Sequence, residues 1–194
     1  MRFLLIYAHP DSDSFGFSIY QGALSALKEA GHEVETLDLY ADHFQPVLST
    51  IERKSYYDLN ADREEIKSKM DQLLRCNGLI FVFPTWWYGM PAILKGYLDR
   101  VWLPGVAFEV VAGRTRPLLG HIVRLAVVTT YGSPWWLNRF IFGDPNRKVF
   151  MRGLRHLLSP TARTLWLAQY GMDFVGVETR KRFLCKVYRK IKRL

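Results

Sequence analysis

Residues 81–105 read FVFPTWWYGMPAILKGYLDRVWLPG and hold the strongest structural signal in the chain. The apolar run Leu79–Phe83 predicts a buried strand, and three adjacent aromatic residues at positions 86–88 follow it in a turn. A helix is expected over Pro91–Trp102, because proline is tolerated in the first helical turn. Ligands of open α/β sheets bind outside the carboxyl ends of the strands. The three rings therefore predict a site for a planar cofactor, although taken alone they also fit a core or a dimer interface.

Outward from this segment, strand and helix patterns alternate along the whole chain. Apolar runs of strand character are Phe3–Ala8, Val34–Leu39, Leu79–Phe83, Leu125–Thr129 and Thr164–Gln169. Helical patterns fall over Phe15–Ala30, Ala61–Arg75, Pro91–Trp102, Pro145–Leu158 and Thr179–Ile191. Five such alternations predict a parallel sheet with helices on both faces. The chain has 194 residues, 49% of them apolar, so we expect one domain over residues 1–194.

Positive charge is concentrated at the end of the chain. The net charge is +9, and residues 177–194 hold eight Lys or Arg against one Glu, which leaves +2 for the rest. An apolar stripe lies opposite the basic residues of this segment and consists of Phe183, Leu184, Val187, Tyr188, Ile191 and Leu194. The pattern is typical of a last helix packed on the sheet with a solvated face. Contact with an anionic membrane surface is the alternative. Because the charge is confined to one helix, we expect no nucleic-acid partner.

Other residue types narrow the function classes. Cys76 and Cys185 match no metal-ligand spacing, so no metal site is predicted, and unpaired thiols favour a cytoplasmic protein. The chain contains no run of about 18 apolar residues, so no membrane span is expected. We find no Ser/His/Asp or paired-carboxylate motif, so no catalytic acid or base is expected. Asp99 and Arg100 are interpreted as a pair on a helix surface, and the long excursion Tyr40–Asn60 as functional.

The first strand leads into a loop rich in hydroxyl and carboxylate side chains. This loop runs from His9 through Ser14 and Phe15 to Ser18. A strand–loop–helix joint of this kind presents backbone N–H groups and a helix N-terminus to an anion. The alternative is that Ser14 is only an N-cap and His9 only a core residue.

Several blocks in this order resemble the quinone-reductase branch of the flavodoxin-like NAD(P)H oxidoreductases, the branch of DT-diaphorase and the modulator of drug activity. The blocks are His9-Pro10 with Ser14-Phe15, Asp38–Ala41, Phe44–Ser49, Phe83–Gly96, Asp99–Val101, Leu103–Gly105 and Thr129–Gly132. The resemblance covers residues 2–134 well and the last 60 residues poorly. It implies a flavodoxin-like three-layer sandwich with five parallel strands in the order 2-1-3-4-5, bound to FAD or, as the alternative, FMN.

The resemblance also implies roles for particular residues. His9, Ser14 and Phe15 match the phosphate loop of the family. Pro84, Thr85, Trp87 and Tyr88, with Trp86 beside them, match the turn that holds the isoalloxazine ring. Thr129, Thr130 and Gly132 match the loop on the far side of that ring. Two positions depart from the family pattern: Gly16 stands where asparagine is usual, and Tyr131 stands where glycine is common.

The resemblance implies hydride transfer from NADPH or NADH through the flavin to a quinone or similar acceptor, in a ping-pong order. It also implies a homodimer. Trp135 and Trp136 fit either a wall over the substrate or a dimer contact. The alternative function is a flavin-binding regulatory or ancillary subunit of a membrane transport system, for which the basic last helix would serve as the docking element.

Overall fold

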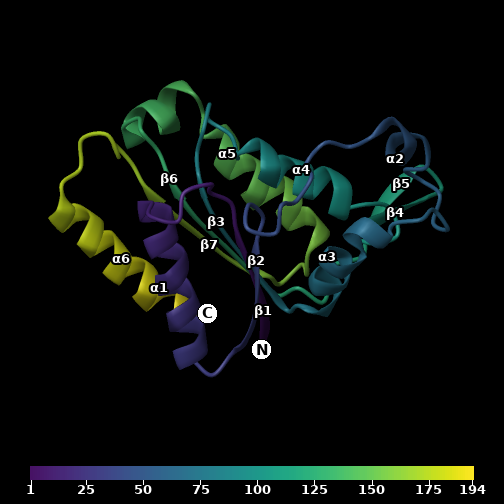
Figure 1. The fold of residues 1–194 in the computed structure, drawn as a ribbon, viewed down its shortest axis with the longest axis horizontal. Coiled ribbons are helices and arrows are strands. Elements are labelled where there is room, and N and C mark those ends of the chain that lie inside the picture. The colour runs from purple at the N-terminus through teal and green to yellow at the C-terminus, as the bar shows by residue number, and fades with distance from the viewer.

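The computed structural model describes residues 1–194 and has a five-stranded parallel sheet at its centre (Figure 1). Its strands, in spatial order, are β2 (Glu33–Asp38), β1 (Arg2–Tyr7), β3 (Gly78–Pro84), β6 (Arg124–Thr130) and β7 (Arg163–Gln169). Each lies within one residue of a predicted strand at both ends. The predicted order 2-1-3-4-5 is confirmed for the strands of this sheet, which are numbered 2-1-3-6-7 because a separate hairpin intervenes.

Helices cover both faces of the sheet. Helices α1 (Phe15–Glu29) and α6 (Val177–Ile191) pack on one face, and α3 (Glu64–Arg75) and α4 (Ala92–Val101) lie on the other (Figure 1). All seven residues of β3 are buried, because a parallel strand between two helical layers has no solvent-facing side. Phe81 and Phe83 face α4, whereas Ile80 and Val82 face α1 and α6. The alternation of side chains along β3 thus fills two separate cores.

Local sequence explains where the first helices begin and end. The Ser14 hydroxyl accepts a hydrogen bond from the N–H of Phe17, which caps α1, and Gly31 follows the helix with a φ of 78°. The short helix α2 (Thr50–Lys54) begins with a reciprocal capping box between Ser49 and Glu52. This helix gives structure to the excursion that we expected over residues 40–60.

Two parts of the chain differ from the sequence-based expectations. The strands β4 (Phe108–Val111) and β5 (Arg114–Pro117) form an antiparallel hairpin that was not predicted, since its strands have four residues each and are mostly exposed. The predicted helix Pro145–Leu158 is confirmed in extent, but its hydrogen-bond type changes along its length. It consists of α5 (Pro145–Lys148), the π-helical turn η2 (Val149–Gly153) and the 3₁₀ turn η3 (Leu154–Leu157), and a further π-helical turn that was not predicted, η1 (Leu137–Ile141), precedes them.

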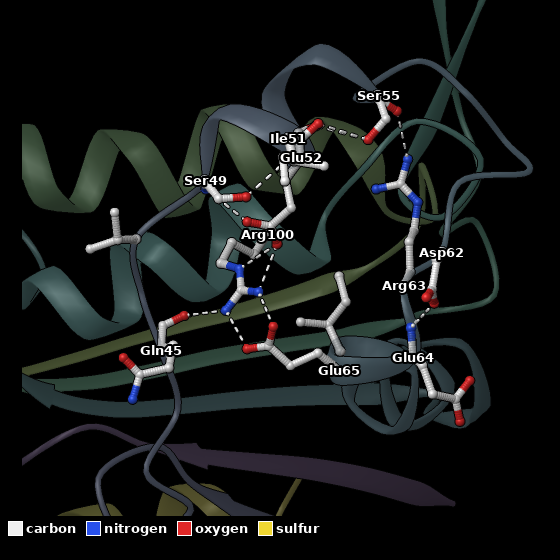
Figure 2. A pocket seen from close by; sticks show the side chains of 12 residues that line it. Gln45, Ser49, Ile51, Glu52, Ser55, Asp62, Arg63, Glu64, Glu65 and Arg100 are labelled. Carbon is white, nitrogen blue, oxygen red and sulfur yellow. Dashed lines mark hydrogen bonds and ion pairs between the residues drawn. The ribbon is translucent and has the colours of Figure 1, made fainter.

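The interpretation of Arg100 as a surface residue is also wrong. Arg100 lies on α4 and is only 3% exposed. Figure 2 shows its guanidinium between Glu52 and Glu65, with N···O distances of 2.6 and 3.0 Å, and its Nη1 donates to the main-chain oxygen of Gln45. The carboxylates come from the excursion and from α3, so Arg100 ties both segments to α4. Asp99, in contrast, lies on the helix surface as predicted, but its partner is Lys95 and not Arg100.

None of the helices combines the length and the apolar composition that are needed to cross a bilayer.

Candidate functional site

The aromatic turn after β3 is a tight hairpin. The N–H and C=O of Trp86 bond to the C=O and N–H of Gly89 at 3.1 and 3.0 Å. The two central residues, Trp87 and Tyr88, have φ values of 49° and 59°, a left-handed conformation that non-glycine residues adopt at a cost of about 1–2 kcal/mol each. Trp87 is 98% exposed, while the ring of Tyr88 packs on Phe142 with centroids 4.2 Å apart. The fold therefore holds an indole ring in solvent on a strained backbone, which is typical of binding sites.

The loop after β1 lies beside this turn. The imidazole of His9 is 6.0 Å from the ring of Trp86, centroid to centroid, and its Nδ1 accepts from the N–H of Asp11 at 3.0 Å. The Ser14 hydroxyl is 3.1 Å from the hydroxyl of Tyr7, and burial raises the pKa of Tyr7 to about 12. Ser14 is therefore an N-cap of α1, as the second interpretation of the loop has it, whereas His9 is only partly buried and lies beside the aromatic turn.

Phe15 and Gly16 lie at the start of α1. The ring of Phe15 points toward α6, where it lies 6.3 Å from the ring of Phe183, so only its backbone faces the loop. The N–H groups of Phe15 and Gly16 have no partner within the helix, as is general for the first helical residues. Helix N-termini with free N–H groups are suited to phosphate oxygens.

The loop after β6 supplies the third wall. The side chain of Thr129 is buried behind the surface, where its hydroxyl lies 2.8 Å from that of Thr85, and the Nδ2 of Asn146 donates to Thr85 at 2.9 Å. Tyr131 is also buried, and its hydroxyl donates to Asp144 at 3.3 Å. Burial raises the pKa of the Tyr131 hydroxyl, so it stays protonated. The hydroxyl groups of these residues bond behind the wall, and the surface itself is formed by Thr85, Thr130, Tyr131 and Gly132.

Two adjoining hollows open between these loops at the carboxyl edge of the sheet. One has a volume of about 530 Å³ and is lined by Pro84, Thr85, Trp86, Trp87, Thr130, Gly132, Met172 and Asp173. The other has a volume of about 420 Å³ and is lined by Thr85, Trp87, Tyr88, Tyr131, Gly132, Ser133, Pro134, Asp173 and Phe174. Four residues border both hollows, so the two adjoin: Thr85, Trp87, Gly132 and Asp173.

Sequence reasoning missed several residues of this cleft. Met172, Asp173 and Phe174 follow β7, and the resemblance was weak over that part of the chain. Their position after the carboxyl end of a predicted strand was the available signal. Asp144 and Asn146 could not be found in this way, because they reach Tyr131 and Thr85 from the start of α5, which follows no strand.

The family assignment agrees with this architecture. The sequence pattern of a family described as having a flavodoxin-like fold matches residues 1–175. The chain belongs to this flavodoxin-like family. Its cleft lies at the edge of the sheet where flavodoxin-like sheets bind ligands, beyond the carboxyl ends of β3, β6 and β7.

Curated relatives of this flavodoxin-like chain are named as oxidoreductases. An uncharacterized NAD(P)H oxidoreductase of Haemophilus influenzae is 40% identical over 124 residues, which are 61% of this chain and 59% of that protein. The NAD(P)H dehydrogenase [quinone] 1 of Rattus norvegicus is 30% identical over 148 residues, which are 68% of this chain and 54% of that protein. The match thus spans somewhat more than half the length of each of these two relatives.

Solved structures share the fold over the whole chain. Smu.1420 from Streptococcus mutans UA159 superimposes with a TM-score of 0.87 and 28% identity, covering 100% of both chains. An FMN-dependent NADH-azoreductase from Bacillus anthracis, solved in complex with FMN, superimposes with a TM-score of 0.76 and 18% identity and covers 99% of this chain and 96% of its own. The second likeness concerns the fold alone.

The residues of the cleft fit a planar heteroaromatic group. The N–H groups of Trp87, Tyr88 and Gly132 take no part in any hydrogen bond within the chain, so three donors are available at its border. A Cβ atom added at Gly132 would come within 2.8 Å of the exposed Asp173 carboxylate, which would have to shift, so glycine here leaves the cradle open. An aromatic ring, free N–H donors and a backbone that a ligand can approach closely are together suited to hold a flat group with polar edges.

Proposed function

We propose that this protein is a flavin-dependent NAD(P)H oxidoreductase. The observation that carries the proposal is the cleft at the carboxyl edge of the sheet, where the exposed Trp87 ring borders both hollows and the N–H groups of Trp87, Tyr88 and Gly132 are free. A flavin bound there would accept a hydride from NAD(P)H and pass it to a second substrate, which is chemistry that the cofactor supplies. The name of the Rattus relative supports a quinone or a similar small molecule as that second substrate.

The residues of the chain would hold and orient the cofactor. The N–H groups of Trp87, Tyr88 and Gly132 would donate to the polar edge of the ring, where fixed donors also stabilise negative charge. The free N–H groups at the start of α1 would bind the phosphate, with Ser14 fixing the loop in place. Thr129 and Tyr131 would act from behind the wall, because their hydroxyls are engaged within the protein.

The absence of an acid–base pair in the cleft fits a hydride-transfer reaction. Donor and acceptor would bind in turn on the same flat apolar wall, which predicts ping-pong kinetics. We propose FAD as the cofactor, with FMN as the alternative, and either NADPH or NADH as the donor. The FMN complex of the Bacillus azoreductase supports a flavin in this fold but does not favour FAD.

A homodimer in the cytoplasm completes the proposal. Trp135, Trp136, Phe140 and Ile141 expose between 51% and 71% of their surface beside the cleft, an apolar patch that a second copy of the chain would cover. Cys76 and Cys185 are unpaired, as is usual in a reducing compartment.

The first experiment is an absorbance spectrum of the purified protein, before and after anaerobic addition of NADPH, with the released flavin identified. We expect a yellow protein that bleaches, and parallel double-reciprocal lines with a quinone as second substrate. Flavin that binds but is not reduced by NADPH or NADH would favour the regulatory-subunit alternative. Protein that cannot be reconstituted with FAD or FMN would overturn the proposal.

A pair of variants tests the role of the indole. Trp87→Ala is expected to raise the Kd for flavin about ten-fold, because loss of an aromatic stacking contact costs about 1–1.5 kcal/mol. Tyr57→Ala is the matched control, since Tyr57 is 63% exposed and lies outside the cleft. Equal affinities of the two variants would exclude Trp87 from the flavin site.

A further inference from the structure

The outer face of α6 carries a dense row of cations. Helix α6 lies against α1 on one face of the sheet, and its inner side is buried through Phe183, Val187 and Ile191 (Figure 1). The opposite side presents Arg182, Lys186, Arg189, Lys190 and Arg193, which are all exposed. We refer to these five residues as the basic stripe. Arg182, Lys186, Arg189 and Arg193 follow one another at spacings of four, three and four, so they lie on the same side of the helix, and Lys190 lies beside Arg189 and three residues before Arg193.

No carboxylate of the protein neutralises the basic stripe. The two acidic residues beside it are already paired, Glu178 with Lys181 and Glu29 with Lys192. The guanidinium Nε atoms of Arg182 and Arg189 reach only main-chain oxygens, at 3.4 Å. Four side chains of the stripe border a small surface hollow of about 180 Å³ whose lining is entirely basic: Lys186, Arg189, Lys190 and Arg193. Like charges at this spacing destabilise a helix, so the arrangement is unfavourable until an anionic surface meets it.

The fold does not require this charge. The family pattern ends at residue 175, and α6 begins at Val177, so the basic stripe lies beyond the residues that the flavodoxin-like family matches. Packing of α6 depends on its buried inner side and would be served equally well by neutral polar residues outside. Residues 1–176 together have a net charge of only +2, so the positive charge is a local feature of the last helix.

We propose that the basic stripe binds the surface of an anionic phospholipid bilayer. Charge complementarity gives the attraction, since cations near such a surface are drawn to its headgroups. Two exposed apolar residues precede the stripe: Phe174 is 86% exposed and Val177 is 65% exposed. Aromatic and aliphatic side chains next to cations are typical of segments that lie in the membrane interface.

The same stripe is poorly suited to nucleic acid. Single-stranded nucleic acids are bound by cations together with exposed rings on which bases stack. Within α6, Phe183 is buried and Tyr188 is half-buried with the ammonium of Lys192 over its ring. Phe174, which precedes α6, is a single exposed ring, so the stripe has no series of rings on which successive bases could stack.

Docking through α6 would also orient the cleft. Met172, Asp173 and Phe174 border the two hollows and lie within five residues of the start of α6. The mouth of the cleft would then lie near the headgroups, where an apolar acceptor partitions. This consequence rests on the proposed function, whereas binding to the bilayer does not.

Vesicle co-sedimentation tests the proposal directly. We expect the protein to bind vesicles of phosphatidylcholine and phosphatidylserine at low salt, to leave them as salt is raised, and to ignore pure phosphatidylcholine. The triple variant Lys186→Gln/Arg189→Gln/Arg193→Gln should bind about 100-fold more weakly, since each cation contributes about five-fold. The control Lys54→Gln/Arg114→Gln/Arg152→Gln removes the same charge from exposed positions elsewhere and should bind like the wild type.

Several outcomes would overturn the inference. They are failure of the wild type to bind at low salt, equal binding of the two triple variants, and tighter binding to duplex DNA or single-stranded RNA than to the vesicles. Circular dichroism of both triple variants checks that each is folded. A fluorophore on the exposed Cys185, which lies between the stripe residues while Cys76 is buried, should be quenched by brominated lipid in bound vesicles. An unquenched label in protein that sediments would show that another face binds.

Discussion

Replacement of Arg100 by methionine should destabilise the protein far more than replacement of a charged residue on a helix surface would. The change removes a cation that is 3% exposed and leaves Glu52, whose side chain is 26% exposed, without its partner. Loss of one member of a buried ion pair costs about 3–5 kcal/mol. Because Glu65 is 66% exposed and regains water, we expect the lower end, about 3 kcal/mol in the free energy of unfolding.

Urea unfolding followed by circular dichroism measures this loss, with the apo protein so that flavin affinity does not enter. A loss of about 3 kcal/mol should lower the Tm by roughly 6–12 °C for a chain of this size. The control is Asp99→Asn, since Asp99 forms only an exposed pair with Lys95 and should cost less than about 1 kcal/mol.

A double variant separates the ion pair from simple packing. Glu52→Gln combined with Arg100→Met should be less destabilised than the sum of the two single variants, because no charge is left unpaired between these residues. A loss below about 1 kcal/mol for Arg100→Met alone would refute the reasoning, as it would mean that the guanidinium contributes no more than a surface charge.

Three further predictions concern other parts of the molecule. Burial raises the pKa of Glu52, but the hydrogen bonds from Ser49 and the ion pair with Arg100 outweigh burial and lower the pKa below 4.5. The ionised carboxylate therefore stabilises the folded protein above pH 4.5, and this stabilisation is lost as the pH falls through the lowered pKa. Acid unfolding of Glu52→Gln should accordingly depend less on pH in that window than that of the wild type. Burial raises the pKa of Cys76 to about 12, so a disulfide reagent at pH 8 should titrate one thiol, Cys185, in the native protein and two in urea. Gly132→Ala should weaken flavin binding about ten-fold with little change in Tm, whereas Gly176→Ala, where a Cβ meets nothing within 4 Å, should leave affinity unchanged.

The amino-acid sequence was sufficient to predict the strands of the sheet, because parallel strands buried on both faces have a distinctive composition. The run before Pro84 is apolar at every position, and a helix signal follows it closely, so strand and crossover could be located within one residue. The aromatic turn was identified for the same local reason, since three large rings after a buried strand have few places in a core.

Sequence alone could not describe the segments whose conformation depends on distant partners. The excursion at 40–60 is anchored by Arg100, which lies some 48 residues beyond Glu52, and nothing near either residue indicates the pair. The segment expected as a helix over 145–158 is helical, but its hydrogen bonding changes from α to π and 3₁₀ along its length, and the sequence pattern does not indicate where. Asp144, just before this helix, and Asn146, in its first turn, bond to Tyr131 and Thr85, and nothing in the local sequence indicates these contacts.

The sequence determined which loops meet at the carboxyl edge of the sheet, because strand order follows from local patterns and the handedness of crossovers. The tertiary structure decided which side chains in those loops face the cleft. Thr129 and Tyr131 turn inward to hydroxyl and carboxylate partners, Phe15 turns to α6, and Trp87 stands in solvent on a left-handed backbone. These orientations depend on contacts between residues 13 to 168 positions apart, and such contacts exist only once the chain has folded.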